Sequence, residues 1–375
     1  MNNLRLSMSV LGNEEVRAVT KVMKEDGYLG MGLEVRNFEK EIAEYLGVPH
    51  NWVVCVNSGT AALHLAVQAT TNPGEEVLVQ SLTYISSFQA ISASNAVPVP
   101  CEVNINTGGI SIDDVKDRVT SKTKVIMPVH YASNPEGIES VYSFAKSNGL
   151  RVIEDAAHAF GCLYQGKKIG SFGDIVCFSF DGIKNITSGE GGCVVTSDNK
   201  IAEYVRNARL LGIKKDTENR FAGKRSWDFD VTHQGYRYHM SNLFAAIGRA
   251  QLKKLDLVFG PKRKKIARLY RDKLVGVKNL LFFHTNLNEQ IPHIQPVRIT
   301  NGKRDLVIKI LKKNNIDTGI HYKPNHLLSL YSGDNKIKLP ITEKLYSEIL
   351  TLPLHPNLET EDIIKISNLI KKELI

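Results

Sequence analysis

Residues 175–197 read IVCFSFDGIKNITSGEGGCVVTS, and this stretch decides the fold. It holds two apolar, β-rich runs, Ile175–Phe180 and Cys193–Ser197, on either side of a turn that is rich in glycine. Five similar runs come earlier in the chain, at Trp52–Val56, Glu76–Gln80, Val97–Cys101, Lys124–Val129 and Arg151–Glu154. Helical periodicity fills most of the gaps between the runs. This alternation predicts an α/β fold in which a seven-stranded, mainly parallel sheet lies between helices.

The two ends of the chain have other patterns. Residues 34–46 place apolar side chains at helical spacing and end at Gly47, a common helix stop. After Ser241 an amphipathic stretch runs through Leu255, and mixed helix and strand patterns follow, with a candidate break at Pro261. We therefore predict two domains. Residues 1–240 form a large α/β domain with an N-terminal helical segment, and residues 241–375 form a smaller α+β domain.

Composition and charge limit the class of protein. The 375 residues carry a net charge of +9, which suits binding to nucleic acid or to anionic small molecules. The lysines are dispersed, apart from short clusters such as Lys262-Arg263-Lys264-Lys265, for which a solvated helix face is the simplest interpretation. No zinc-finger or RNA-recognition signature accompanies these clusters. We predict that nucleic acid is not a partner.

Targeting signals and cysteine spacing give two further expectations. No apolar run approaches the roughly 18–20 residues of a membrane span, and the first residues lack the apolar core of a signal peptide. We therefore predict a cytoplasmic protein without a membrane partner. None of the five cysteines forms a CxxC pair, and four lie in apolar stretches. Buried free thiols are expected rather than disulfides or a metal site.

Two motifs at the ends of predicted strands carry polar groups. Asn57-Ser58-Gly59-Thr60 lies between a strand and a helix predicted at 61–69, where free backbone amides attract an anion. A simple helix cap is the alternative. Glu154-Asp155 follows a buried strand, and a buried carboxylate needs a cation such as a protonated pyridine nitrogen. A helix cap with a surface acid is the alternative there.

Lys184 follows the end of another predicted strand by four residues, beside Gly189-Glu190-Gly191-Gly192. A lysine can form a Schiff base when its surroundings lower its pKa, although a single lysine usually lies on the surface. The sequence thus contains an anion-binding turn, an acid at one strand end, the hydroxyl of Ser179 at another, and a lysine beside a glycine-rich loop. These are the groups that a phosphorylated pyridine aldehyde needs.

With these motifs in this order, the chain resembles the DegT/DnrJ/EryC1/StrS family of nucleotide-sugar aminotransferases, which depend on pyridoxal phosphate (PLP). The resemblance covers nearly the whole chain. It rests on Phe38-Glu39, Tyr45–Val48, Asn57–His64, Pro73–Val77, Glu154–Ala159, Gly170–Asp174, Phe178–Phe180, Gly189–Gly192, His239–Asn242, Ala245–Gly248, Gln251-Leu252, His321-Tyr322 and Leu352–Pro356.

The resemblance implies the fold-type I aminotransferase architecture, PLP as cofactor and a homodimer with shared active sites. It also implies catalytic roles for three residues. Lys184 would carry the cofactor as a Schiff base and move the proton, Asp155 would keep the pyridine nitrogen protonated, and His158 would lie near the phenolic oxygen. The other implied cofactor contacts are the phosphate contacts of Ser58, Gly59, Thr60 and Ser179, ring stacking by Tyr84, and a contact from Asn242 to the phosphate in the neighbouring subunit.

Two segments depart from the family pattern. Gly235–Met240 reads GYRYHM where the family often has GYNYRM, and residues 130–133 read HYAS where HLYG is common. The first segment faces the neighbouring active site in the family. Substrate contacts are therefore not carried over to that segment.

The resemblance predicts transfer of an amino group from an amino acid, L-glutamate in particular, to a keto group of a nucleotide-linked deoxysugar, for surface polysaccharide or glycan biosynthesis. His158 favours a 4-keto over a 3-keto substrate, because 3-aminotransferases of the family tend to carry glutamine there. One alternative is a sugar dehydratase of the same family, which has histidine in place of the lysine; Lys184 opposes it. A non-enzymatic regulator or nucleic-acid binder is the other alternative, and the complete set of cofactor residues opposes it.

Overall fold

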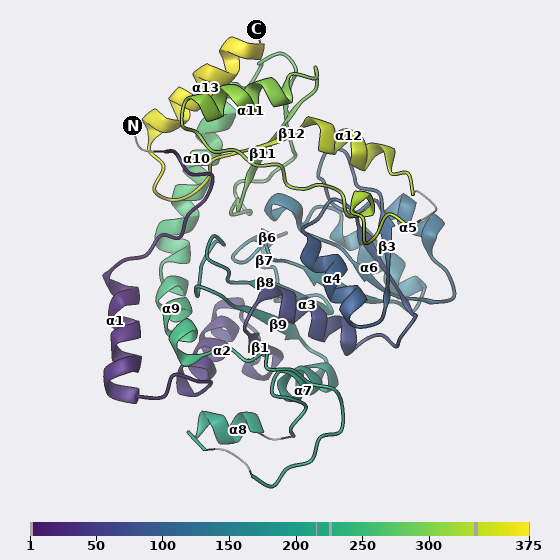
Figure 1. Cartoon of the computed structure of the whole chain (residues 1–375), viewed down its shortest axis with the longest axis vertical. Coiled ribbons are helices and arrows are strands. Elements are labelled where there is room, and N and C mark those ends of the chain that lie inside the picture. Colours follow the sequence, from purple (N-terminus) through teal and green to yellow (C-terminus); the bar gives the residue numbers. More distant parts are fainter. Residues whose placement is uncertain (1–2, 215, 225–226, 334–336, 375) are drawn as a thin grey trace.

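The computed structural model describes residues 3–214, 216–224, 227–333 and 337–374, and its centre is a seven-stranded sheet (Figure 1). The strand order is β1-β9-β8-β5-β4-β2-β3. β9 pairs antiparallel with both of its neighbours, and every other neighbouring pair is parallel. This arrangement confirms the predicted sheet. Its strands are β1 (Val53–Val56), β2 (Glu76–Gln80), β3 (Val97–Cys101), β4 (Thr123–Met127), β5 (Arg151–Asp155), β8 (Ile175–Ser179) and β9 (Gly192–Thr196).

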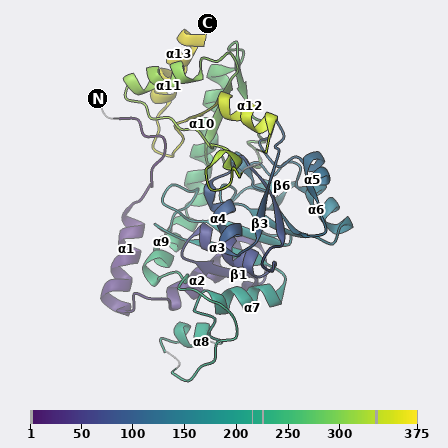
Figure 2. The same ribbon diagram turned by 45° about the vertical axis from the view of Figure 1, so that its right-hand side comes forward.

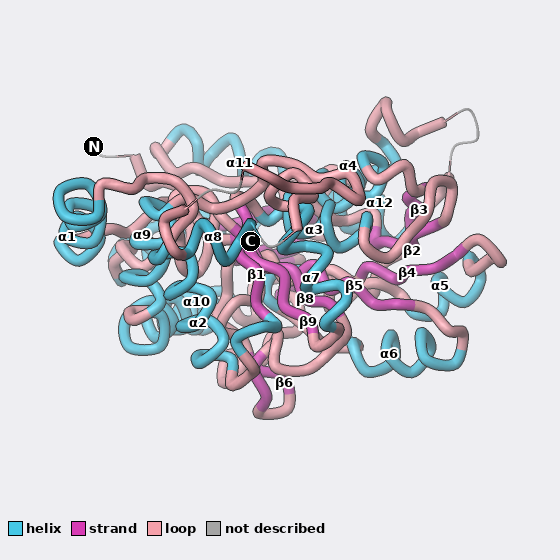
Figure 3. Tube along the Cα trace, turned by 90° about the horizontal axis from the view of Figure 1, so that it is seen from below, coloured by secondary structure: helices cyan, strands magenta, loops and turns pink. Residues whose placement is uncertain are grey.

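Helices cover both faces of this sheet, which explains why its central strands are apolar along their whole length. On one face, α3 (Gly59–Gln68), α4 (Ile85–Ala93) and α7 (Asn199–Ala208) share a buried cluster with the strands. The helices that pack on the other face are α2 (Leu33–Leu46), α5 (Ile112–Arg118), α6 (Ile138–Ser147) and α9 (Asn242–Leu252). Figure 3 shows the strands between the two helical layers. The expected helices at 34–46 and 61–69 are therefore present.

Shorter elements complete this part of the chain. They are α1 (Asn13–Lys21), the π-helical turn η1 (Val22–Asp26), the 3-10 turns η2 (His50–Trp52) and η3 (Tyr131–Ser133), the hairpin of β6 (Leu163–Tyr164) with β7 (Lys167–Lys168), and α8 (Asp216–Phe221). All five cysteines are buried and free, as expected.

The C-terminal part has a small antiparallel sheet in the order β10-β11-β12. Its strands are β10 (Leu280–Phe282), β11 (Gln295–Ile299) and β12 (Ile349–Leu352). The helices of this part are α10 (Gly260–Leu274), α11 (Arg304–Lys313), α12 (Pro340–Glu348) and α13 (Thr360–Leu374), with the 3-10 turn η5 (Asn325–Leu327). α10, α11 and α13 share a buried apolar cluster with the sheet. The N-terminal segment reaches this part, where Leu4 forms a bridge with Ile316 (Figure 2).

One long helical column joins the two parts of the molecule. It consists of α9, the π-helical turn η4 (Leu255–Phe259) and α10 (Figure 1). Pro261, the expected break, lies in the first turn of α10, directly after the π-helical turn η4. α9 lies beyond residue 240, yet it packs on α1 and α2. The boundary between residues 240 and 241 stays a prediction.

The side chains of Lys262-Arg263-Lys264-Lys265 were expected to lie on a solvated helix face, and one of them is buried instead. Lys262 and Lys265 are exposed, but Arg263 is 2% exposed because it lies on the inner face of α10 with Ile266 and Tyr270. The expectation was therefore wrong for Arg263. None of the helices in the described residues is long and apolar enough to cross a membrane.

Candidate active site

The carboxyl ends of two neighbouring parallel strands bring the central groups of the site together. β5 ends at Asp155 and β8 ends at Ser179, and in the register of this pair Asp155 lies opposite Cys177. The loops after these strands carry His158 and Lys184. Ligand sites in open α/β sheets lie at this edge, because the loops diverge there. The sheet topology thus places Asp155, Ser179, His158 and Lys184 at one edge.

The turn before α3 lies against the same edge. Ser58 caps α3, since its Oγ accepts a hydrogen bond from the amide of Ala61 at 3.0 Å. A Cβ atom on Gly59 would lie 2.7 Å from Cβ of Ser179, and one on Gly192 would lie 2.6 Å from the carbonyl oxygen of Ser58. Only glycine fits at these two positions. The turn is therefore both a helix cap and a side-chain-free cradle next to the Ser179 hydroxyl, and such a cradle suits a phosphate group.

Asp155 is buried, and its carboxylate has two hydrogen-bond donors. Ser87 Oγ donates to Oδ2 at 2.7 Å, and the amide of Ala157 donates to Oδ1 at 3.2 Å. A hydrogen bond to a charged group stabilises the fold by about 1.5–3 kcal/mol, whereas burying a carboxylate away from water costs several kcal/mol. Burial accordingly raises the pKa of Asp155, although Ser87, Ala157 and the charge of Lys184 oppose the shift. No lysine, arginine or histidine nitrogen in the described ranges lies within 4 Å of this carboxylate, so it fits a cationic ligand group.

The amine of Lys184 is held in the interior. The residue closes a turn that begins at Asp181, because its amide donates to the carbonyl of Asp181 at 3.0 Å, and its Nζ lies 3.5 Å from Nε2 of His293. Burial lowers the pKa of Lys184, while the carboxylates of Asp181 and Asp155 raise it and Arg263 lowers it further. A lowered pKa increases the fraction of the neutral amine, which is the nucleophilic form.

Two residues that the sequence did not assign to the site, His293 and Tyr322, surround His158. The ring of His158 lies 4.5 Å from that of His293, centroid to centroid, and its Nε2 lies 3.0 Å from Oη of Tyr322. His158 Nδ1 and His293 Nδ1 are buried and have no hydrogen-bond partner in the described part of the chain. Burial, followed by the charge of Lys184, holds the pKa of both histidines well below the usual range. Both rings are thus neutral, with a nitrogen left to contact a ligand.

Tyr84 and Thr60 lie at the rim of this cluster. Tyr84 is exposed, and its ring centroid lies 5.7 Å from that of Tyr322. Thr60 is also exposed, and its hydroxyl contacts the Ser86 hydroxyl at 2.8 Å. Tyr84 therefore has a free ring face beside the cluster, as stacking on a planar ligand requires.

The DegT/DnrJ/EryC1/StrS aminotransferase family model matches residues 9–371. The chain belongs to this family. Spore coat polysaccharide biosynthesis protein SpsC of Bacillus subtilis is 35% identical over 96% of this chain and 94% of its own. The dTDP-4-dehydro-2,3,6-trideoxy-D-glucose 4-aminotransferase of Saccharopolyspora spinosa is 33% identical over 96% and 94%. The PLP form of Spr1654 from Streptococcus pneumoniae, at 26% identity, covers 100% of both chains with a TM-score of 0.89.

Membership of this family confirms the predicted enzyme class, an aminotransferase, and the predicted architecture. It also confirms the cofactor, PLP. The site fits PLP on its own evidence, because it offers a cradle closed to side chains, a buried carboxylate without a cation, and an amine with a lowered pKa.

Asn242 of this aminotransferase is the one predicted cofactor residue that the described structure does not bring to the other predicted cofactor residues. It starts α9 and is buried. Its Nδ2 donates to the carbonyl of Tyr28 at 2.9 Å, and its Oδ1 accepts from the amide of Glu34 at 3.2 Å. Asn242 therefore holds the turn that leads into α2.

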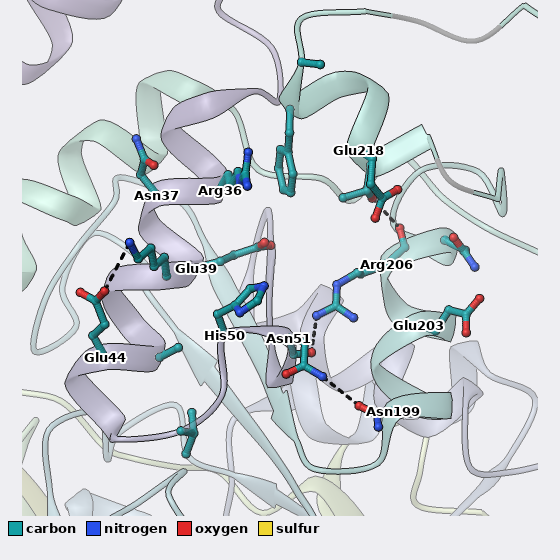
Figure 4. A pocket seen from close by; sticks show the side chains of 17 residues that line it. Arg36, Asn37, Glu39, Glu44, His50, Asn51, Asn199, Glu203, Arg206 and Glu218 are labelled. Carbon is teal, nitrogen blue, oxygen red and sulfur yellow. Dashed lines mark hydrogen bonds and ion pairs between the residues drawn. The ribbon is translucent and has the colours of Figure 1, made fainter.

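A large cavity of this aminotransferase lies away from the predicted cofactor residues. It measures about 890 Å³ and opens between α2, α7 and α8 (Figure 4). Some of its charged side chains contact one another or the backbone: Lys40 pairs with Glu44 at 3.7 Å, and Arg206 donates to the carbonyl of Asn51. None of the predicted cofactor residues lines it. Cavity size is therefore a poor guide to this active site, which is recognised from the chemistry of its side chains.

Proposed function

We propose that this cytoplasmic enzyme transfers an amino group from L-glutamate to the 4-keto group of a nucleotide-linked deoxysugar. One observation carries the amino-transfer part: the amine of Lys184 and the carboxylate of Asp155 are both desolvated at one sheet edge, beside the Gly59 cradle. The sugar part draws support from the relatives. One is a 4-aminotransferase of a dTDP-linked keto sugar, and SpsC serves in polysaccharide biosynthesis.

Each predicted side chain then has a task in holding PLP. Ser58, Gly59, Thr60 and Ser179 would hold the phosphate, and Tyr84 would cover one face of the ring. Asp155 would pair with the pyridine nitrogen, which relieves the cost of its buried charge. When bound, PLP supplies an electron sink for the carbon that loses its proton.

The proton movements fall to Lys184 and its neighbours. Amino transfer requires a group that removes a proton at one carbon and returns it at another; a neutral amine can remove it, and the ammonium that then forms can return it. Lys184 is suited to this task, because burial lowers its pKa. Neutral His158, held by Tyr322 Oη, would donate to or accept from the phenolic oxygen without adding a charge.

The position of amination on the sugar can be decided with matched substrates. The purified enzyme would receive 4-keto and 3-keto deoxysugars on the same nucleotide, with L-glutamate as donor, and NMR would locate the new amine. We expect amination at carbon 4, because the relative with a named substrate acts there and His158 follows the Asp155-Ala156-Ala157 run. Amination at carbon 3 alone would contradict the 4-keto preference. Absence of turnover with every nucleotide sugar would contradict the sugar part of the proposal.

We also propose a homodimer in which Asn242 contacts the cofactor of the neighbouring subunit. Lys184→Ala and Asn242→Ala variants, each weakly active alone, would be mixed and their subunits exchanged. Heterodimers then contain one intact site, so we expect activity to recover to about a quarter of wild type with random pairing. Mixing Lys184→Ala with the double variant, which leaves no intact site, is the control. If exchanged subunits recover nothing, Asn242 acts only within its own subunit, on the turn from Tyr28 to Glu34.

A further inference from the structure

Arg263 is a buried cation directly behind the amine-bearing segment of the active site. Its guanidinium makes hydrogen bonds only to backbone carbonyls in the described part of the chain. Nη2 donates to the carbonyls of Ile183 and Lys184, both at 3.4 Å. Nη1 donates to the carbonyls of Pro292, His293 and Leu354 at 3.4, 3.1 and 3.5 Å. One guanidinium therefore joins the Lys184 segment to the His293 segment.

The two segments joined by Arg263 are those whose side chains meet in the site. Lys184 Nζ and His293 Nε2 lie 3.5 Å apart. The backbone amide of His293 is held separately by Ser133 Oγ at 2.9 Å, and that hydroxyl also contacts the carbonyl of His158 at 2.5 Å. Arg263 thus ties together the backbones that carry the amine of Lys184 and the imidazole of His293, and Ser133 ties the backbone of His293 to that of His158.

The charge of Arg263 is not neutralised by a carboxylate. Among the described residues, no aspartate or glutamate oxygen lies within 4 Å of its guanidinium, and its Nε is buried without a partner. Burial lowers its pKa to about 10, so it remains protonated at neutral pH. A buried charge without a counter-ion is costly to the fold, and such groups concentrate at functional sites.

The electrostatic surroundings of Lys184 show what this charge does. Asp155 and Asp181 favour the ammonium form of Lys184, whereas Arg263 opposes it by like-charge repulsion. The nearby imidazoles of His158, His293 and His321 all have lowered pKa values, so they are neutral and do not replace the cation. His355 likewise has a lowered pKa, caused by burial and then partly by Arg263.

We propose that Arg263 is a positioning residue for amino transfer. The hydrogen bonds of its planar guanidinium to backbone carbonyls, called the fork below, hold Lys184 against His293, and its charge favours the neutral amine of Lys184. The proposal rests on the proposed function of this site. It assigns a task to a residue whose hydrogen bonds, among the described residues, go to backbone carbonyls.

Two variants separate the fork from the charge. Arg263→Met removes both, and Arg263→Lys keeps the charge but loses the planar fork. Lys262→Met, an exposed neighbour on the same helix, is the matched control. The first readout uses the cofactor-free enzyme: reductive methylation of Lys184 with formaldehyde and cyanoborohydride, followed across pH by peptide mass spectrometry. The second readout is kcat and KM for L-glutamate in the holoenzyme.

Arg263→Met should shift the midpoint of Lys184 methylation upward by about 1 pH unit, because it removes a like charge. Arg263→Lys should keep the wild-type midpoint yet lower kcat by about 10²-fold with little change in KM, because the amine is displaced. A folded Arg263→Met with the wild-type midpoint would overturn the role of the charge. Wild-type kcat in Arg263→Lys would overturn the role of the fork. If Arg263→Met does not fold, a methylation midpoint in Arg263→Lys that differs from the wild-type value would overturn the role of the charge, because this variant keeps the charge. The methylation midpoint needs no sugar, so failure of the sugar assignment remains distinguishable.

Discussion

Lys184→Ala should lose the absorbance of the lysine-bound cofactor and lower turnover by about 10⁴-fold, the upper range for loss of a general acid–base group. In the proposed mechanism Lys184 supplies both the covalent anchor and the proton carrier, and its neighbour His293 has a pKa held well below the usual range. A neutral imidazole of low basicity cannot replace the amine in either task. Absorbance spectra and initial rates with L-glutamate measure the two effects.

The matched control for Lys184→Ala is Lys167→Ala, in the exposed hairpin of β6 and β7. It should keep wild-type absorbance and turnover, because its side chain lies in solvent outside the cluster. Turnover of Lys184→Ala within tenfold of this control would remove Lys184 from the catalytic role.

Asp155→Asn should lower turnover by about 10²- to 10³-fold, because an amide cannot keep the pyridine nitrogen protonated. The same substitution should not lower the stability of the cofactor-free enzyme. The pKa of Asp155 is raised by burial, so at neutral pH the ionised carboxylate costs stability in the cofactor-free enzyme. The neutral amide avoids this cost, and it can still accept from Ser87.

The cofactor-free Asp155→Asn enzyme should therefore melt at or above the wild-type temperature at pH 7, and the difference should shrink as the pH falls and the wild-type carboxyl becomes protonated. Thermal melts of both cofactor-free proteins across this range test the sign. A cofactor-free variant that is clearly less stable than wild type at neutral pH would indicate that the carboxylate has a structural partner. Near-normal turnover of the Asp155→Asn holoenzyme would show that Asp155 does not keep the pyridine nitrogen protonated.

The central sheet could be predicted because its strands are buried on both faces. Ile175–Ser179 and Gly192–Thr196 are buried at every position, so their apolar runs were unbroken. The positions of Asp155 and Lys184 near the strand ends followed from the same runs, whereas their roles came from the family resemblance and stay predictions. The end of a strand was harder to place, and β4 begins one residue earlier and ends two earlier than expected.

His293 and Tyr322 could not be placed from local pattern, because they reach the site from segments more than 100 residues beyond Lys184. Tyr322 belongs to the His321-Tyr322 motif of the family, which signalled importance without a role. Arg263 did carry a usable signal. It stands three residues before Ile266 and seven before Tyr270, on the buried face of α10, and this periodicity outweighs the charge of the surrounding lysines.

The most direct test of the account is to reduce the purified holoenzyme with borohydride and to map its peptides by mass spectrometry. We expect a single pyridoxyl mass increment, on the peptide that contains Lys184, with none on the exposed Lys167 peptide. A stable increment on a different lysine, or reduced holoenzyme with no increment at all, would contradict the assignment of Lys184 as the lysine that holds the cofactor.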